Sequence, residues 1–258
     1  MADIDPILRE FLDQKVFEYQ RPEFLESDPL QIPHRYEQRE DQEISGFLTA
    51  TISWGNRKSI LNNAKQLMNR MGASPYDFIM SATPDQRAPL FPFVHRTFNE
   101  TDLNYFFEAL RNIYENHEGM LSVFLEKAEQ KSLQPAISHF KKVFFELPHE
   151  TRSEKHVSDP AKGSAAKRLN MMLRWFVRKD VPGVDLGIWH GLLHPRQLSC
   201  PLDVHSGNVA RKLGLLHRLQ NDGKALVELD DALRELDPED PVKYDFALFG
   251  IGASKTDL

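Results

Sequence analysis

Apolar residues recur along the chain at helical spacing, three or four residues apart, and show little of the alternation that marks a half-buried strand. Asp5 and Pro6 predict the start of a first helix, as an N-cap followed by a proline in the first turn. A second stripe runs from Asp41 to Ser53, is interrupted at residues 54–57, and resumes from Ile60 to Met71. No pair of strands is predicted, so the expected fold class is all-α, with about ten helices.

Further helices follow the same periodicity. Thr101 is expected to cap a long helix, and a helix over residues 165–178 carries the apolar stripe Leu169, Met172, Leu173 and Phe176. Proline-rich segments at 19–39 and 82–98 predict long loops. The other helices are expected near 118–130, 134–147, 185–193, 223–236 and 240–249.

Composition narrows the class of protein. The chain has 258 residues, 41% of them apolar, which is enough for a substantial core. Because Cys200 is the only cysteine, the chain holds no internal disulfide and no cysteine-bound zinc or iron–sulfur cluster, and we expect a reducing cytoplasm. The acidic N-terminal stretch does not resemble a secretory signal, and no apolar run approaches membrane-spanning length.

The formal net charge of −6 excludes a protein whose whole surface is basic and binds nucleic acid. A local basic surface is still compatible with the sequence, because residues 152–180 contain eight Lys or Arg residues against three acids. Arg211, Lys212 and Arg218 extend this basic set. Such a surface either contacts phosphates or is an ordinary solvated helix face.

The segment "CPLDVHSGNVARKLGL" places Asp203 directly before a helical stripe. An aspartate there is a good N-cap, which is the structural interpretation. Lys167 follows "GSAA" in the first turn of the predicted 165–178 helix, where the partly positive helix N-terminus disfavours a cation. A neutral amine is what a nucleophile requires, although for Lys167 alone a solvated surface lysine is the simpler interpretation. Together, an amine and a carboxylate are the groups needed to displace a substituent from a sugar carbon.

The histidines and tryptophans offer further candidate ligand contacts. His190 and His194 have the spacing of a metal-binding pair, but no third ligand is fixed by spacing, and no metal is expected. Trp189, in the segment before Asp203, is a candidate for stacking on an extruded base, and Trp54 is a second candidate.

Four segments resemble the helix-hairpin-helix (HhH-GPD) DNA glycosylases, in the order in which that superfamily carries them. They are "QEISGFLTATISWGNRKSI", "GSAAKRLNMML", "PLDVHSGNVARKLGL" and "VKYDFALFGIGA". Nearly the full length is also similar to an uncharacterised bacterial domain-of-unknown-function family, through "DPLQIPHRY", "DQEISGFL", "VHRTFN", "KRLNMMLRWFVR", "GVDLGIW" and "DPVKYDFALFGIG". That second likeness supplies no activity of its own.

The glycosylase resemblance implies a two-lobed module, with a helical lobe over 42–178 and a second lobe of 1–41 plus 179–258. It implies base-excision repair on double-stranded DNA by a monomer, with Lys167 and Asp203 as catalytic residues and AP-lyase activity through a lysine Schiff base. A monovalent cation at the hairpin is compatible with it. The DNA-contacting residues that it implies are Asn56, Arg57, Gly163, Ser164, Arg168, His205, Arg211 and Lys212.

The sequence departs from the superfamily pattern in the hairpin, where Ala165 replaces the second glycine, and in the absence of a cysteine cluster. The 36-residue separation of Lys167 and Asp203 is long, and it is most similar to that of archaeal 8-oxoguanine glycosylases. Two alternatives therefore stay open: a non-catalytic DNA- or lesion-binding module, and a glycosylase acting on nucleosides or RNA.

Overall fold

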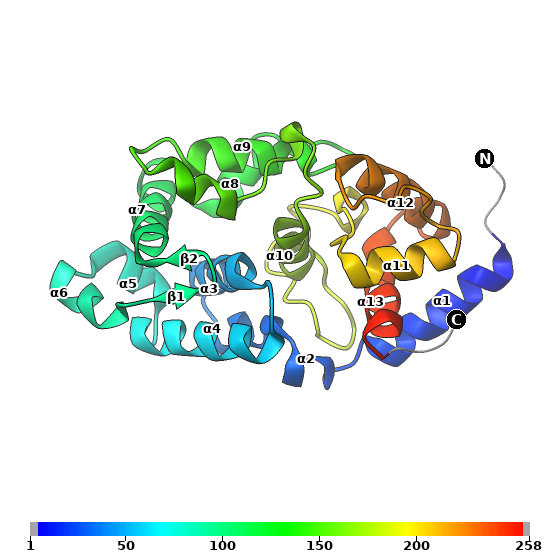
Figure 1. Cartoon of the computed structure of the whole chain (residues 1–258), viewed down its shortest axis with the longest axis horizontal. Coiled ribbons are helices and arrows are strands. Elements are labelled where there is room, and N and C mark those ends of the chain that lie inside the picture. The colour runs from blue at the N-terminus through cyan, green and yellow to red at the C-terminus, as the bar shows by residue number, and fades with distance from the viewer. Residues whose placement is uncertain (1–4, 255–258) are drawn as a thin grey trace. The chain divides into compact units, whose positions relative to one another are not determined.

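The computed structural model describes residues 5–254, and this part of the chain divides into two compact units. Unit 1 contains residues 5–24, 128–135 and 159–254, and unit 2 contains residues 25–127 and 136–158. Helices dominate both units, and in the described residues the named strands form a single two-stranded hairpin (Figure 1). The predicted all-α class is confirmed.

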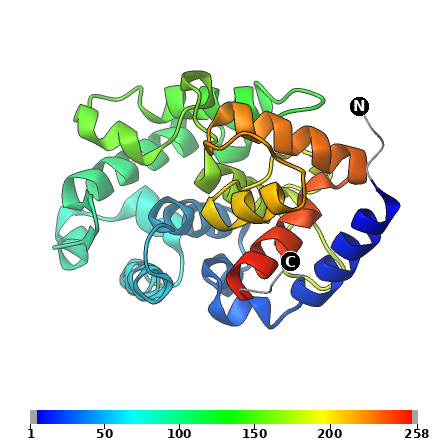
Figure 2. The same ribbon diagram turned by 45° about the vertical axis from the view of Figure 1, so that its right-hand side comes forward.

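Unit 1 is built from five main helices. They are α1 (Pro6–Tyr19), α10 (Lys167–Val177), α11 (Val204–Lys212), α12 (Gly223–Leu236) and α13 (Tyr244–Ser254). Helix α13 is apolar on nearly all sides and packs against both α1 and α11, as Figures 1 and 2 show from two directions. The packing of α13 on α1 requires a glycine, because a Cβ at Gly250 would lie 2.3 Å from the ring of Tyr19.

Two buried arginines, one on α10 and one at its C-cap, organise the interior of unit 1. Arg174 and Arg178 are both less than 5% exposed, and both pair with the buried carboxylate of Asp185. Arg174 also pairs with Asp245 of α13, and Arg178 donates to Asp240, 2.8 Å from its Nε. Since buried charges are tolerated only when they are paired, this network links the C-terminal end of α10 to the segment before α13 and to α13 itself.

The core of unit 2 is aromatic. The rings of Phe47, Phe106, Phe140 and Phe144 pack together, and the centroids of contacting pairs lie 4.7–5.7 Å apart. Short helix α2 (Phe24–Ser27) starts at the last residue of unit 1, and α9 (Gln134–Phe144) starts within unit 1. The remaining elements are α3 (Arg39–Ile52), α4 (Arg57–Met71), α5 (Pro75–Ser81), α6 (Pro84–Arg87), β1 (Val94–His95), β2 (Phe98–Asn99), α7 (Glu100–Asn116) and α8 (Met120–Leu125).

Local predictions differ from the structure at several places, since α5 was not predicted and α2 and α6 lie in segments predicted to be loops. Three further differences have a direct physical reason. The β1–β2 hairpin was not predicted, because two residues per strand are too few to show alternation. Helix α7 is capped by Asn99 and not by Thr101, since Asn99 and Asp102 exchange reciprocal side-chain to backbone hydrogen bonds. Residues 185–193 form no helix, because the Trp189 N–H donates to the carbonyl of Phe176 at 2.7 Å, which holds the segment along α10.

The predicted lobe boundary also differs from the observed units. The prediction placed α10 in a lobe over 42–178 and Asp203 in the other lobe. In the structure, residues 159–178 belong to the same unit as Asp203. The ion pairs of Arg174 and Arg178 to residues 185, 240 and 245 explain this arrangement, since they tie α10 to the C-terminal part of the chain.

Candidate functional site

Lys167 and Asp203 lie at the N-terminal ends of two helices of unit 1. Lys167 is the first residue of α10, and Asp203 is the N-cap of α11. The Nζ of Lys167 lies 3.7 Å from Oδ2 of Asp203. Their side chains are 32% and 21% exposed, so the pair is accessible without being fully solvated. The structure thus brings together the amine and the carboxylate that the sequence singled out.

The two carboxylate oxygens of Asp203 have different surroundings. Oδ1 accepts the backbone N–H of His205 at 2.8 Å and that of Ser206 at 3.0 Å, and the Ser206 hydroxyl lies 3.2 Å away. Ser206 Oγ in turn accepts the N–H of Asp203 at 2.9 Å, completing a capping box. Oδ2 faces Lys167. Asp203 is therefore a helix cap through one oxygen, while the other oxygen faces the amine.

A strained turn positions Lys167. Ala166, directly before it, has φ 42° and ψ 41°, a left-handed conformation that costs a residue with a Cβ about 1–3 kcal/mol. The turn is held by the Ala166 N–H donating to Ser164 Oγ at 3.1 Å and by the Asn170 side chain donating to the Ala165 carbonyl at 2.9 Å. Ala166 is 1% exposed, so packing holds it in this conformation and orients the start of α10.

The segment before Lys167, where a hairpin was predicted, contains only a short helical turn. A single 3-10 turn, Pro160–Lys162, precedes Gly163, which has φ 83°. The carbonyl of Gly163 accepts the N–H of Gly223, the first residue of α12, at 2.8 Å. Gly163 and Ser164 are therefore packed beside the start of α12, and both line a cavity of unit 1.

A buried acidic group lies close to the pair. Asp245 of α13 is 5% exposed, and burial raises its pKa to about 6; the charge of Arg174 opposes the shift, that of Asp203 adds to it, and that of Lys167 opposes it. Cys200 Sγ is 3.8 Å from Asp245 Oδ1, and burial with this carboxylate raises the pKa of the thiol. Sequence reasoning missed Asp245, although a lone acid in the apolar stretch "YDFALFGIG" was a signal.

The other predicted DNA contacts of unit 1 are exposed or half-buried. His205 is exposed and its ring lies 6.4 Å from that of Phe249, edge to face. Arg211 is committed to the local structure, since it donates to the Arg218 carbonyl and to the Asn221 side chain. Lys212 is exposed. Burial lowers the pKa of Arg168, next to Lys167, to about 10, so this guanidinium stays charged at neutral pH.

The predicted contacts in the Trp54–Arg57 segment belong to unit 2. Asn56 is the N-cap of α4 and accepts the N–H of Ser59 at 3.2 Å, while Arg57 lies 3.9 Å from Asp28. Trp54 is half-buried, and the guanidinium of Arg96 lies 4.8 Å above its ring. This segment connects α3 to α4, as the interrupted apolar stripe predicted.

Trp189 lies in the core, contrary to its predicted role in stacking on a base. Its side chain is 0% exposed, and its ring meets that of Phe176 edge to face at 4.9 Å. A residue buried in this way is part of the core and offers no free face on which an extruded base could stack. Within residues 5–254, no three His, Cys, Asp or Glu side chains gather as a metal site would require. In the same range, no helix has the length and apolarity needed to cross a bilayer.

These observations define an all-α protein in which an amine and a carboxylate meet at the starts of two helices of one compact unit. The chain belongs to the family described as "Protein of unknown function (DUF2400)", whose sequence profile matches residues 28–254. The predicted membership of a domain-of-unknown-function family is thereby confirmed. No curated protein and no solved structure matches the chain.

Proposed function

We propose that this protein is a lysine-dependent DNA N-glycosylase with AP-lyase activity, acting as a monomer on double-stranded DNA that carries a damaged base. The observation that carries the proposal is the 3.7 Å separation between Lys167 Nζ and Asp203 Oδ2. The likeness of the segments around both residues to helix-hairpin-helix glycosylases supports it. The long sequence separation of the two residues makes oxidised purines the first substrates to test.

The chemistry assigns one role to each side chain. Asp203 takes a proton from the Lys167 ammonium, and the resulting amine attacks C1′ of the extruded nucleotide. The C1′–N bond breaks, its electron pair leaves with the base, and the base takes up a proton. Asp203 also stabilises the positive charge that develops on the sugar. Opening of the sugar ring gives an iminium between Nζ and C1′, and loss of a C2′ proton then expels the 3′-phosphate.

Borohydride trapping tests the proposal, because hydride reduces the iminium to a stable secondary amine. Duplexes containing 8-oxoguanine, other damaged bases or an abasic site serve as substrates. The parent protein is expected to form a covalent adduct, and Lys167→Ala is expected to form none. Lys162→Ala is the matched control: Lys162 is an exposed lysine five residues away, and its removal makes the same change in charge. An adduct that persists in Lys167→Ala would refute the assignment.

The ion pair itself favours one alternative. At 3.7 Å the two side chains can form an ordinary ion pair, and a lysine in such a pair contacts phosphate without any covalent chemistry. A lesion-binding module without chemistry would show tight, salt-dependent binding to damaged duplexes and no adduct in the parent protein. Base release from mononucleosides alone would instead indicate a nucleoside glycosylase.

A further inference from the structure

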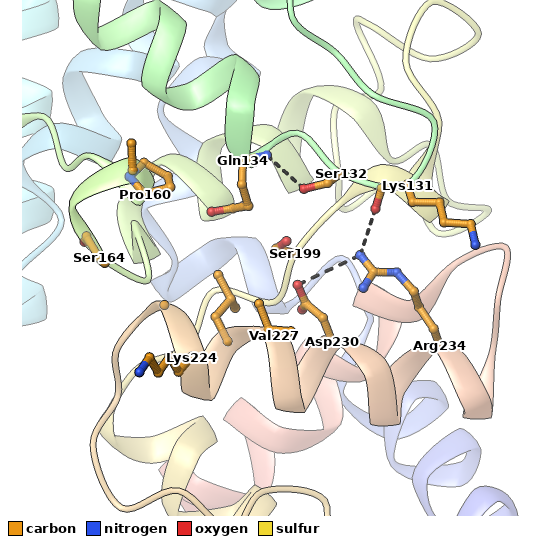
Figure 3. Close-up of a pocket in the computed structure, with 14 residues that line it drawn as sticks. Lys131, Ser132, Gln134, Pro160, Ser164, Ser199, Lys224, Val227, Asp230 and Arg234 are labelled. Atoms are coloured by element: carbon orange, nitrogen blue, oxygen red, sulfur yellow. Dashed lines mark hydrogen bonds and ion pairs between the residues drawn. The ribbon is translucent and has the colours of Figure 1, made fainter. Parts of the chain in front are cut away.

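Unit 1 contains a cavity of about 630 Å³ that includes neither Lys167 nor Asp203 among its lining residues. One wall is α12, and the facing side is formed by the start of α9 and by residues 160–164 (Figure 3). The volume lies within the range of about 300–1,000 Å³ typical of small-molecule sites. Apolar surface dominates the lining, with Leu226 and Val227 on α12 and Pro160 facing them.

A buried carboxylate lies in this apolar lining. Asp230 is 6% exposed and extends from α12 toward Ser199, as Figure 3 shows. Its Oδ1 accepts the N–H of Cys200 at 2.9 Å. Burial raises the pKa of Asp230 to about 7, although hydrogen bonds from Ser199 and Cys200 and the charge of Arg234 act to lower it. Asp230 is therefore a largely desolvated acceptor that titrates near neutral pH.

Arg234 lies beside Asp230 but does not donate a hydrogen bond to its carboxylate. The nearest atom of the Arg234 guanidinium, Nη2, lies 3.9 Å from Asp230 Oδ2, which is beyond hydrogen-bond distance. The same Nη2 lies 3.1 Å from the carbonyl of Leu198 and 3.3 Å from that of Lys131. Because these carbonyls take the N–H groups of Nη2, Arg234 does not form a hydrogen-bonded ion pair with Asp230. A ligand that brings its own cation would supply what the carboxylate lacks.

A second acceptor lines the same cavity. The Nε2 of Gln134 donates to Asn170 Oδ1 at 2.8 Å, which fixes the orientation of the amide. Its Oε1 is buried, and among residues 5–254 no donor lies within hydrogen-bond distance of it. Buried polar atoms normally have partners, so an acceptor without one in a cavity wall points to a donor supplied from outside the chain.

We propose that this cavity binds a small organic cation of the amidine or guanidine class, with its N–H groups directed at Asp230 and Gln134. The planar or apolar body of the ligand packs against Val227, which is 60% exposed at the mouth of the cavity. Carboxylates bind such cations through paired, charge-assisted hydrogen bonds. The proposal does not rest on the glycosylase assignment.

Charged groups around the cavity determine how binding depends on pH. The basic residues Lys131, Lys224 and Arg234 line it, and the charge of Arg234 acts to lower the pKa of Asp230, while the neighbouring Asp231 acts to raise it. Benzamidine remains cationic between pH 6 and 8, so the change in binding over this range follows the ionisation of Asp230. With a pKa of about 7, we expect benzamidine to bind about tenfold more tightly at pH 8 than at pH 6.

Isothermal titration calorimetry with benzamidine, and with benzoate as an anion of the same shape, tests the proposal on the full chain. Benzamidine is expected to bind at one site, and benzoate is expected not to bind. Asp230→Asn should weaken benzamidine binding at least about tenfold. The matched control is Asp231→Asn, an exposed residue on the same helix that loses the same charge. At pH 8, where Asp230 is ionised in both proteins, it should bind as the parent does.

Val227→Trp provides a second variant with little risk to folding, because Val227 is exposed. The indole is expected to block the mouth of the cavity and abolish binding. Lys167→Ala should bind benzamidine like the parent, which separates this site from the proposed catalytic pair. Equal binding of benzoate and benzamidine, unchanged binding by Asp230→Asn, or no saturable binding up to ~10 mM benzamidine would overturn the assignment.

Discussion

Oδ1 of Asp203 holds the first N–H groups of α11, and Oδ2 of the same carboxylate lies 3.7 Å from the amine of Lys167. One residue thus supports a helix end and faces a candidate nucleophile. Because the two oxygens act separately, substitutions can remove one contribution and keep the other.

Asp203→Asn should preserve the N-cap, because an asparagine oxygen accepts the same N–H groups. Asp203→Ala should lower the free energy of unfolding by about 1 kcal/mol, the usual cost of losing a side-chain cap. Urea denaturation measures both values. If Asn proved as destabilising as Ala, the charge facing Lys167 would be the main source of stability. Adduct formation in the borohydride assay should fall in both variants, since both remove the carboxylate that takes the proton.

Arg174→Met should lower the free energy of unfolding by about 3–5 kcal/mol, because it leaves Asp185 and Asp245 buried without one of their counter-charges. Guanidinium chloride denaturation followed by circular dichroism gives this value. Arg196→Met is a matched control, since Arg196 pairs with Glu239 at the surface at 3.8 Å, and it should change stability by less than about 1 kcal/mol. A small effect of Arg174→Met would mean that the network is dispensable.

The contribution of Asp230 to the free energy of unfolding should decrease as the pH rises from about 4 to about 7. Burial raises the pKa of Asp230 from 3.8 to about 7, so between these values the folded protein holds a proton that the unfolded chain has released. Raising the pH therefore favours unfolding in this window, by a few kcal/mol at most. Asp245, with its pKa raised to about 6, adds to the same slope.

The contribution of Asp230 is isolated by comparing the parent with Asp230→Asn, since asparagine keeps an acceptor for the Cys200 N–H and does not titrate. Urea midpoints at pH 5 and pH 8 should differ less in the variant than in the parent. Other acids, such as Asp237, have lowered pKa values and affect both proteins equally. The same pH dependence in parent and variant would contradict the raised pKa of Asp230.

Gly250→Ala should lower the free energy of unfolding by about 1–3 kcal/mol, because its Cβ would lie 2.3 Å from the Tyr19 ring and force α13 away from α1. Thermal unfolding measures the effect. Pairing it with Tyr19→Ala is expected to recover part of the loss, since the truncated side chain leaves room for the methyl group. An additive double variant would show that the two residues do not clash.

Local and periodic features of this protein were predictable from its sequence. Apolar spacing of three and four residues predicted the all-α class, the interruption between α3 and α4, and the bounds of α12. Asp203 was predicted as an N-cap from its position before an apolar stripe, and its hydrogen bonds agree. Such features depend on neighbours within one or two helical turns, which a single sequence contains.

Only the tertiary structure decided what depends on residues far apart in the chain. The sequence predicted Trp189 as a stacking residue, whereas in the structure it packs against Phe176 in the core. The observed unit boundary differs from the predicted lobe boundary because Arg174 and Arg178 form ion pairs with acids at positions 185, 240 and 245. The cavity around Asp230 combines segments near residues 131, 160, 199 and 230, which no periodic pattern connects. Helix propensity acts locally, whereas burial and charge pairing depend on which helices meet.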